Sequence, residues 1–327
     1  MNTIPVVQLR DVTKRIGSKT IVDHLSFDVL PGEVFGFLGP NGAGKTTTIR
    51  MMVGLMSLSV GEVLIKGLSI KSRFEEAMMH IGAIVENPEF YKFMTGYQNL
   101  QHFARMIPGI TEERLQEVIS LVKLEHRIHD KVKTYSLGMR QRLGVAQAIL
   151  HRPSVLILDE PTNGLDPEGI RELRDYLRQL SQKEGIAIIV SSHLLSEMEL
   201  MCDRVAIIQN GRLLDVRSFK EAPSGPGMLE VVLEVDRPEE AARAASDLLG
   251  EGHVQPYAAS PSENGGAEEG ASAKTDGSLT VQLGSREEIA KLNERLVSAG
   301  IRVYGIRTQN KSLEEQFLEV TRGNQIV

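Results

Sequence analysis

The sequence predicts an α/β fold built on a mostly parallel sheet, followed by a small α+β domain. Short apolar runs, such as residues 34–38, 155–158 and 186–190, are typical of strands buried on both faces of a parallel sheet. Residues 95–150 contain no convincing strand and separate two strand-rich parts. Residues 226–327 hold 17 acidic and 10 basic residues, whereas the preceding part holds 26 and 27, so the tail is predicted to be a separate unit.

The bulk composition narrows the class of protein. The chain has 327 residues, of which 41% are hydrophobic, so it can bury a sizeable core. Its net charge of −6 argues against general nucleic-acid binding. Cys202 is the one cysteine, which excludes an internal disulfide. The N-terminus lacks signal-peptide features, and no apolar run approaches the roughly 20 residues that span a bilayer. We therefore expect a cytoplasmic protein whose membrane role, if any, comes through a partner.

Alternating strand and helix signals follow along the first part of the chain. We expect strands over residues 8–11, 21–29, 34–38, 61–67 and 81–85, then over 154–160, 186–190 and 205–208. Between the two groups, apolar positions follow helical spacing: Leu115, Val118, Ile119 and Val122. The sequence therefore predicts a helical subdomain over about residues 87–144.

A glycine-rich stretch lies between the strand over 34–38 and a helix predicted over 46–56. It matches G-x-x-x-x-G-K-[ST], the P-loop motif, in which backbone N–H groups at a helix N-terminus cradle phosphates. Lys45 can reach the β- and γ-phosphates, and the Thr46 hydroxyl can bind Mg²⁺. An ordinary glycine-rich turn is the alternative, which the strand–loop–helix context disfavours. The predicted phosphate-binding residues are Gly39, Pro40, Asn41, Gly42, Ala43, Gly44, Lys45, Thr46 and Thr47.

Polar residues end two later strands. Asp159 and Glu160 end one, and Ser191-Ser192-His193 follows the next. Open α/β sheets bind ligands at the carboxyl ends of their strands. Alone, each could be an ordinary strand-to-loop junction, and a single histidine after a strand is more often structural than catalytic. Their order after the P-loop favours one shared site.

These motifs together make residues 5–220 resemble the nucleotide-binding subunits of ABC transporters, a P-loop NTPase family. The signature loop separates that family from other P-loop ATPases, and here it is a variant, Ser-Leu-Gly-Met in place of Ser-Gly-Gly-Gln. The matching segments are residues 39–46 for Walker A, 136–139 for the signature loop, 156–159 for Walker B, 163–166 for the D-loop, and His193 for the switch histidine.

A narrower resemblance rests on residues 81–88, Phe90-Tyr91 and 135–142. These segments are similar to bacterial ATPases that serve bacitracin- and lantibiotic-type resistance or immunity transporters. Most of the wider family has glutamine where this chain has Glu86. We interpret Glu86 as a further Mg²⁺ ligand; the alternative is a solvent-exposed side chain or one paired with a base on the partner.

The resemblance implies ATP and Mg²⁺ as cofactors. Thr46 and Asp159 would hold the metal, Glu160 would accept a proton from the attacking water, and His193 would fix the γ-phosphate and Glu160. Ser136 and Gly138 would complete the ATP site of a second subunit. Two more positions are counted with the nucleotide site: Asp166 of the D-loop, and Ile16, which stands where the family often has an aromatic residue on adenine. The alternative for Ile16 is a place in the core.

The tail contains an apparent repeat. Strand–helix–strand patterns at 229–235, 238–249 and from Val254, then at 279–283, 285–299 and 301–306, predict a small ferredoxin-like domain over 226–327. Residues 258–278 read as a disordered linker, and a capping pattern starts a last helix over 312–321. This domain could have a regulatory or dimer-contact role, or it could only stabilise the protein. The lack of clustered ligand-type residues favours the stabilising role.

The sequence thus predicts an ATPase domain over 1–225 that powers a separate transmembrane permease, for export of or resistance to a peptide antibiotic or similar amphipathic substrate. We expect a homodimer, or a pair with a related ATPase, peripheral on the inner face of the membrane, with no nucleic-acid partner. One alternative is a non-transport ABC-type ATPase acting on nucleic acid or ribosomes, but such proteins usually carry two ATPase units. Another is an ATP-binding regulator without turnover, which Glu160 and His193 disfavour.

Overall fold

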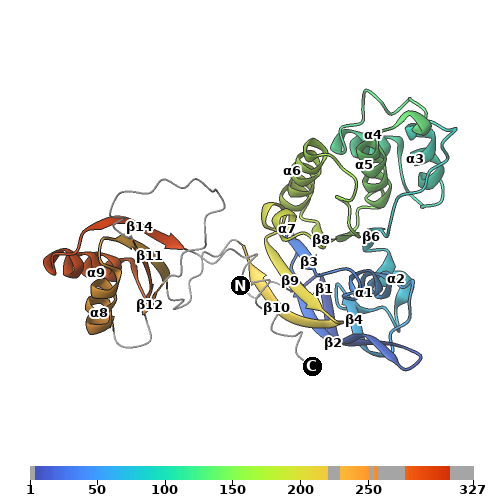
Figure 1. The fold of residues 1–327 in the computed structure, drawn as a ribbon. Coiled ribbons are helices and arrows are strands. Elements are labelled where there is room, and N and C mark those ends of the chain that lie inside the picture. Colours follow the sequence, from blue (N-terminus) through green and yellow to red (C-terminus); the bar gives the residue numbers. More distant parts are fainter. Residues whose placement is uncertain (1–3, 220–228, 250–253, 257–276, 310–327) are drawn as a thin grey trace. The chain divides into compact units, whose positions relative to one another are not determined.

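The computed structural model describes residues 4–219, 229–249, 254–256 and 277–309 (Figure 1). The chain forms two compact units, Met1–Lys220 and Glu221–Val327. The predicted linker lies outside the described residues except for Gly277 and Ser278, which belong to a strand rather than to the linker. The helix predicted over 312–321 also lies outside the described residues.

A six-stranded sheet forms the centre of the first unit, in the order β10-β9-β3-β8-β7-β6. All neighbours from β9 to β6 are parallel, and β10 is antiparallel to β9. Every residue of β3, β7 and β8 is buried, which confirms the prediction from the apolar runs. The strands are β3 (Val34–Leu38), β6 (Ile81–Ile84), β7 (Val155–Leu158), β8 (Ala187–Ser192), β9 (Arg204–Gln209) and β10 (Arg212–Ser218).

A second, antiparallel sheet has the order β2-β1-β4-β5. Its apolar face shares a core with the central sheet and with α1 (Lys45–Met52), where Phe27 stacks on Phe35 at 5.3 Å between ring centroids. β1 runs beyond the predicted 8–11, through a bulge at Asp11 whose backbone is left-handed (φ 52°). The remaining elements here are β1 (Val7–Ile16), β2 (Lys19–Val29), β4 (Val60–Ile65), β5 (Leu68–Ser69) and α2 (Phe74–Met78).

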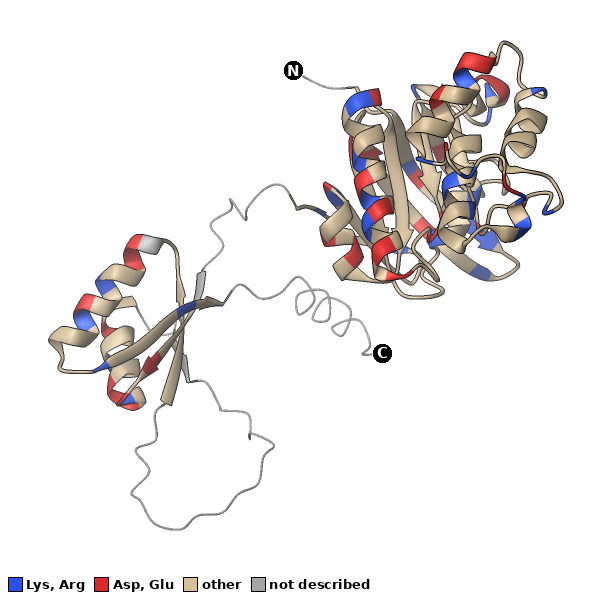
Figure 2. Ribbon diagram, turned by 90° about the horizontal axis from the view of Figure 1, so that it is seen from above, with Lys and Arg blue, Asp and Glu red and all other residues tan. Residues whose placement is uncertain are grey.

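Helices cover the other face of the central sheet. α6 (Pro167–Glu184) and α7 (Leu195–Met201) both contact β3 and β8, and Met198 packs against β3 at Gly36. Asp166 caps α6, and Gly185 ends it in the left-handed conformation (φ 68°). Figure 2 shows acidic and basic residues mixed along the helices of both units. Of the helices named here, α6 and α7 pack against the strands β3 and β8, whose ends form the site described below.

Residues 95–150 contain helices joined by turns and no strand, as predicted, with one isolated bridge between Thr95 and Lys131. Thr95 and Gln98 form a capping box at the start of the first helix, and Ser136 caps the last. The elements are α3 (Gly96–Ala104), α4 (Glu112–Leu121), the 3₁₀ helix η1 (Val132–Thr134) and α5 (Leu137–Ala148).

The second unit is an antiparallel sheet of order β12-β13-β11-β14 with α8 and α9 packed on it. The two strands of each β-α-β repeat are separated by one strand of the other repeat, which is the predicted ferredoxin-like arrangement. Its core includes Val231, Leu233, Val281 and Leu292. The elements are β11 (Leu229–Val235), α8 (Pro238–Leu249), β12 (Val254–Pro256), β13 (Gly277–Leu283), α9 (Arg286–Ser298) and β14 (Val303–Gln309).

Candidate functional site

The loop between β3 and α1 requires glycine at several positions. Gly42 and Gly44 have positive φ angles (81° and 104°), which residues other than glycine rarely adopt. A Cβ atom on Gly39 would lie 2.4 Å from the carbonyl oxygen of Ile208 in β9. The loop is therefore a tight turn that presents backbone rather than side chains.

The N-terminus of α1 is suited to an anion. The bond from Thr48 N–H to Gly44 O (2.9 Å) is the first of the helix, so the N–H groups of Lys45, Thr46 and Thr47 have no helical acceptor four residues earlier. Such a terminus attracts phosphate through these donors and the helix dipole. The Lys45 side chain is only 4% exposed, and its Nζ donates to Gly39 O at 2.8 Å.

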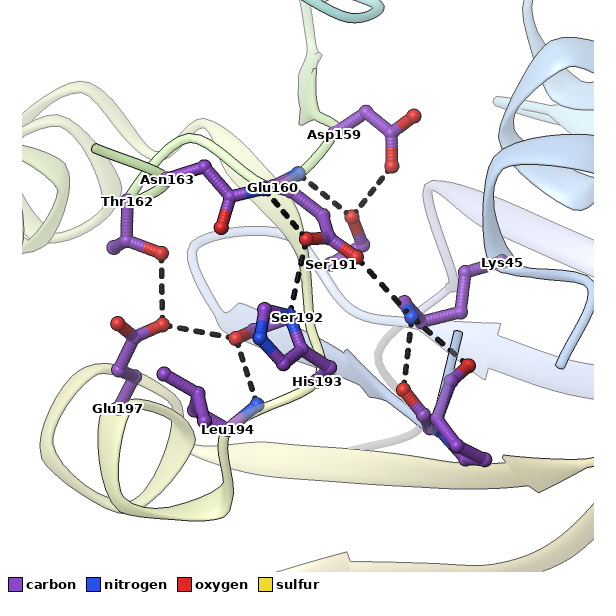
Figure 3. A network of polar contacts seen from close by, with 12 residues as sticks. Lys45, Asp159, Glu160, Thr162, Asn163, Ser191, Ser192, His193, Leu194 and Glu197 are labelled. Carbon is purple, nitrogen blue, oxygen red and sulfur yellow. Dashed lines mark hydrogen bonds and ion pairs between the residues drawn. The ribbon is translucent and has the colours of Figure 1, made fainter. Parts of the chain in front are cut away.

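A buried hydroxyl joins the ends of β7 and β8 (Figure 3). Ser191 Oγ donates to Asp159 Oδ1 at 2.7 Å and accepts the Glu160 backbone N–H at 2.8 Å. Asp159 is itself 7% exposed, and its backbone N–H donates to Ile84 O of β6. Three adjacent strand ends thus hold the backbone at Asp159 and Glu160 and orient the Asp159 carboxylate.

The Glu160 carboxylate is the centre of the cluster. Its Oε1 lies 3.2 Å from Lys45 Nζ, and its Oε2 accepts from Asn163 Nδ2 at 2.7 Å and lies 3.1 Å from His193 Nδ1. Burial favours the protonated acid, but the hydrogen bonds from Asn163, Lys45 and His193 outweigh it, so the pKa of Glu160 lies below its ordinary value. An ionised carboxylate beside a phosphate-binding loop can accept a proton from a water.

Two oxygen donors of the kind that Mg²⁺ prefers lie at the end of β7 and at the start of α1. The Asp159 carboxylate ends β7, and Thr46 lies in the first turn of α1. A carboxylate and a hydroxyl are the hard donors that Mg²⁺ prefers, and it usually keeps several waters, so two protein ligands fit it. The described part of the chain contains no group of three or more His, Cys, Asp or Glu residues that could hold a metal ion.

Glu86 lies apart from this cluster. It follows β6 in a left-handed backbone conformation (φ 66°), its side chain is 66% exposed, and its carboxylate forms an ion pair with Arg50 of α1. The side chain is exposed, as one part of the alternative expected, and the base that pairs with it belongs to this chain, whereas the alternative named a base on the partner; the Mg²⁺ role of Glu86 stays a prediction.

The signature loop lies against the D-loop of the same chain. The Ser136 hydroxyl accepts the Met139 N–H at 3.2 Å as the cap of α5, and Gly138 and Leu165 line one small cavity. Asp166 Oδ1 accepts the Gly169 N–H at 2.9 Å as the cap of α6. These three predicted residues thus have local structural contacts and are not part of the Lys45–Glu160 cluster.

Ile16 ends β1 beside the turn that leads to β2. Its side chain is 53% exposed, so the alternative that placed it in the core is wrong. Exposure is caused by its position at the last pair of the hairpin, opposite Lys19. An exposed aliphatic side chain remains available to a nucleotide base.

Several polar residues of the site were given no role by the sequence. Ser191 and Asn163 hold Glu160, and Thr162, Ser192 and Glu197 form a second group beside it. The serines had one sequence signal, because they end a strand immediately before His193. Glu197 had none, since it becomes a neighbour only through the fold.

Comparison with known proteins places this arrangement in one family. The family model described as "ABC transporter" matches residues 22–163. The chain is 55% identical over 318 residues to the uncharacterized ABC transporter ATP-binding protein YhcH of Bacillus subtilis (strain 168), covering 97% of this chain and 96% of that one. It is 46% identical over 214 residues to the bacitracin transport ATP-binding protein BcrA of Bacillus licheniformis, covering 65% and 70%.

A solved structure gives the same result. The ATP-binding subunit of an ABC transporter superimposes with a TM-score of 0.58 at 29% identity, covering 65% of this chain and 90% of that one. In the described residues, no helix has the length and apolar character needed to cross a membrane.

Proposed function

The chain belongs to the ATP-binding proteins of ABC transporters, and from this premise we propose that the cluster around Lys45 and Glu160 hydrolyses Mg²⁺–ATP to drive a separate membrane permease. The observation that carries the assignment is the Glu160 carboxylate, held between the phosphate-loop lysine and His193. Phosphoryl transfer needs mainly positioning and charge stabilisation, and this cluster offers both.

Each residue has a distinct part in this proposal. Lys45 and the N–H groups at the start of α1 bind the phosphates. Thr46 and Asp159 would hold Mg²⁺, which supplies neutralisation of phosphate charge when bound. Glu160, whose lowered pKa keeps it ionised to more acidic pH than an ordinary glutamate, accepts the proton of the attacking water, and His193 keeps that carboxylate oriented.

The signature loop supports a dimer. Ser136 caps α5 and Gly138 lies beside Leu165 of the D-loop in its own chain, whereas the Lys45–Glu160 cluster lies at the ends of β3, β7 and β8 and the start of α1. With one phosphate loop and one signature loop, a chain can complete two ATP sites only by pairing with a second copy or a related ATPase. Asp166 and Ile16 would contact nucleotide in that assembly, Ile16 on the adenine.

We infer the permease partner and the class of substrate from the relatives of this chain. BcrA is a bacitracin transport ATP-binding protein, so we assign this chain to export of, or resistance to, a peptide antibiotic or similar amphipathic compound. The protein would then be peripheral on the inner face of the membrane through its permease. We assign residues 1–225 as the ATPase domain, 87–144 as its helical subdomain and 226–327 as an accessory domain.

Two measurements test the assignment. Phosphate release by the full chain should require Mg²⁺ and disappear in Lys45→Ala, and a tagged chain should co-purify with a polytopic membrane protein encoded beside it. Unchanged hydrolysis by Lys45→Ala would refute the site. Normal hydrolysis together with recovery of ribosomes or nucleic acid instead of a membrane protein would refute the transport role.

A further inference from the structure

A second hydrogen-bonded group lies beside the site, on the side of Glu160 and His193 away from Lys45, and is centred on Glu197 of α7 (Figure 3). One oxygen of its carboxylate, Oε2, accepts from Thr162 Oγ1 at 2.7 Å and from Ser192 Oγ at 2.8 Å. Both hydroxyl residues are almost inaccessible, at 4% and 1% exposed. A charged acceptor makes such hydrogen bonds stronger than neutral ones.

These bonds join the two segments that carry the reacting side chains. Thr162 lies two residues after Glu160, and Ser192 immediately precedes His193. Ser192 Oγ also accepts the Leu194 N–H at 3.0 Å, so the backbone is fixed on both sides of His193. Glu197 touches neither Glu160 nor His193 through any contact found in the described residues.

The backbone at Glu160 depends on such support. Its φ of +46° is uncommon for a residue with a side chain and persists only where neighbouring contacts determine the conformation. Ser191 Oγ holds this turn through the Glu160 N–H, and Glu197 holds it through Thr162. Removing the second contact frees the loop between Glu160 and the D-loop.

We propose that Glu197 is a positioning residue for ATP hydrolysis, which holds Glu160 and His193 in register across β7 and β8 through Thr162 and Ser192. The inference rests on the proposed function, in which Glu160 accepts the proton. The contacts of Lys45 run to Gly39, Pro40 and Glu160, and the phosphate loop meets Ser192 only through backbone atoms, from Gly39 N–H to Ser192 O (3.3 Å), so we expect side-chain changes at Glu197 to leave nucleotide binding intact.

The test compares Glu197→Ala, Glu197→Gln and Thr162→Val in the full chain, with Glu199→Ala as a matched control from the exposed face of α7. Glu197→Ala should lower kcat by about 10- to 100-fold, since small misplacements cost this much, while the Kd for ATP stays within about twofold. Glu197→Gln should recover most of the rate, because its amide oxygen still accepts both hydroxyls.

Thr162→Val should also lower kcat, and Glu197→Ala combined with it should be little slower than Glu197→Ala alone, because both remove the same link. If Glu197→Ala does not fold, Thr162→Val and Glu197→Gln carry the test. Wild-type kcat in Thr162→Val, an equal loss in Glu197→Gln and Glu197→Ala, or an equal loss in Glu199→Ala would each overturn the proposal.

Glu160→Gln in the same assay separates this inference from its premise. If Glu160→Gln hydrolyses ATP at the wild-type rate, the assignment of Glu160 fails. If Glu160→Gln is inactive and Glu197→Ala is not slowed, only the positioning role of Glu197 fails.

Discussion

Glu160 and Glu86 begin from the same local geometry and end in different environments. Each follows a strand of the central sheet, β7 and β6 are parallel neighbours, and both residues have left-handed backbones. Glu160 is 19% exposed and is held by a lysine, an asparagine and a histidine, whereas Glu86 is 66% exposed and pairs with one arginine. β7 has β8 on its other side, whereas β6 ends the sheet. The end of a strand thus determines where a carboxylate lies, and a neighbouring strand on each side is needed to enclose it.

The largest difference between the two should be in turnover. Glu160→Gln removes the proton acceptor and should lower kcat by about 10²- to 10⁴-fold while ATP binding is retained. Glu86→Gln should lower kcat far less in saturating Mg²⁺. Phosphate release and binding of a fluorescent ATP analogue by both variants check this. Comparable losses in the two would show that enclosure does not distinguish them.

A substitution at Ser191 removes one of the contacts that hold Glu160 in its partly buried position. Ser191→Ala leaves the Glu160 N–H and one oxygen of Asp159 without their buried partner, and an unsatisfied buried group costs about 1–3 kcal/mol. We expect the free energy of unfolding to fall by that amount and kcat to fall with it. Ser196→Ala, on the exposed surface of α7, is the control. Urea unfolding curves that superimpose for the wild type and Ser191→Ala would contradict the role of this hydroxyl.

A smaller effect should come from the Arg50–Glu86 pair. An exposed ion pair is worth about 0.2–1 kcal/mol, so it can alter metal affinity by less than about fivefold. If Glu86 approaches Mg²⁺, Glu86→Gln should raise the free Mg²⁺ concentration needed for half-maximal hydrolysis, and Arg50→Gln, which frees the carboxylate, should lower it. Mg²⁺ titrations of both variants that coincide with the wild type would remove Glu86 from the metal site.

The smallest effect should be confined to acidic pH. Because the pKa of Glu160 is lowered, its ionised form and the stability gained from its partners persist below the ordinary range of a glutamate and are lost as pH falls through the folded-state pKa. Asn163→Ala removes one donor to the ionised form, so the acidic limb of the kcat–pH profile should move to higher pH. Glu160→Gln should lack this limb. An unmoved limb in Asn163→Ala would mean that Asn163 does not stabilise the charge.

The sequence identified much of this fold because its signals were local. The strand over 34–38 and the two interleaved repeats of the tail have the expected elements. Other boundaries moved for local reasons: α1 ends at Met52 instead of Met56 because Gly54 is left-handed (φ 74°). At the site, Lys45, Asp159, Glu160 and His193 could be found from motifs, and their roles stay predictions.

The supporting residues could not be found in the same way. Ser191 lies beside Asp159 only because β7 and β8 pair with Leu158 opposite Val190. That register depends on packing between strands that are distant in sequence, and no local pattern in the chain encodes it. Glu197 and Glu86 illustrate the same limit, since their partners Thr162 and Arg50 come from other elements.

The central strand of the tail has a consequence for how the protein is made. β11 is synthesised first in its unit, yet both strands that pair with it, β13 and β14, come later. The chain leaves the ribosome N-terminus first, so one edge of β11 can pair once β13 has emerged, whereas the edge that pairs with β14 stays open until Gln309 has emerged. An apolar strand with open edges adheres to other chains. A premature stop before Val303 would therefore release an ATPase unit whose tail keeps one edge of β11 open to pairing with other chains.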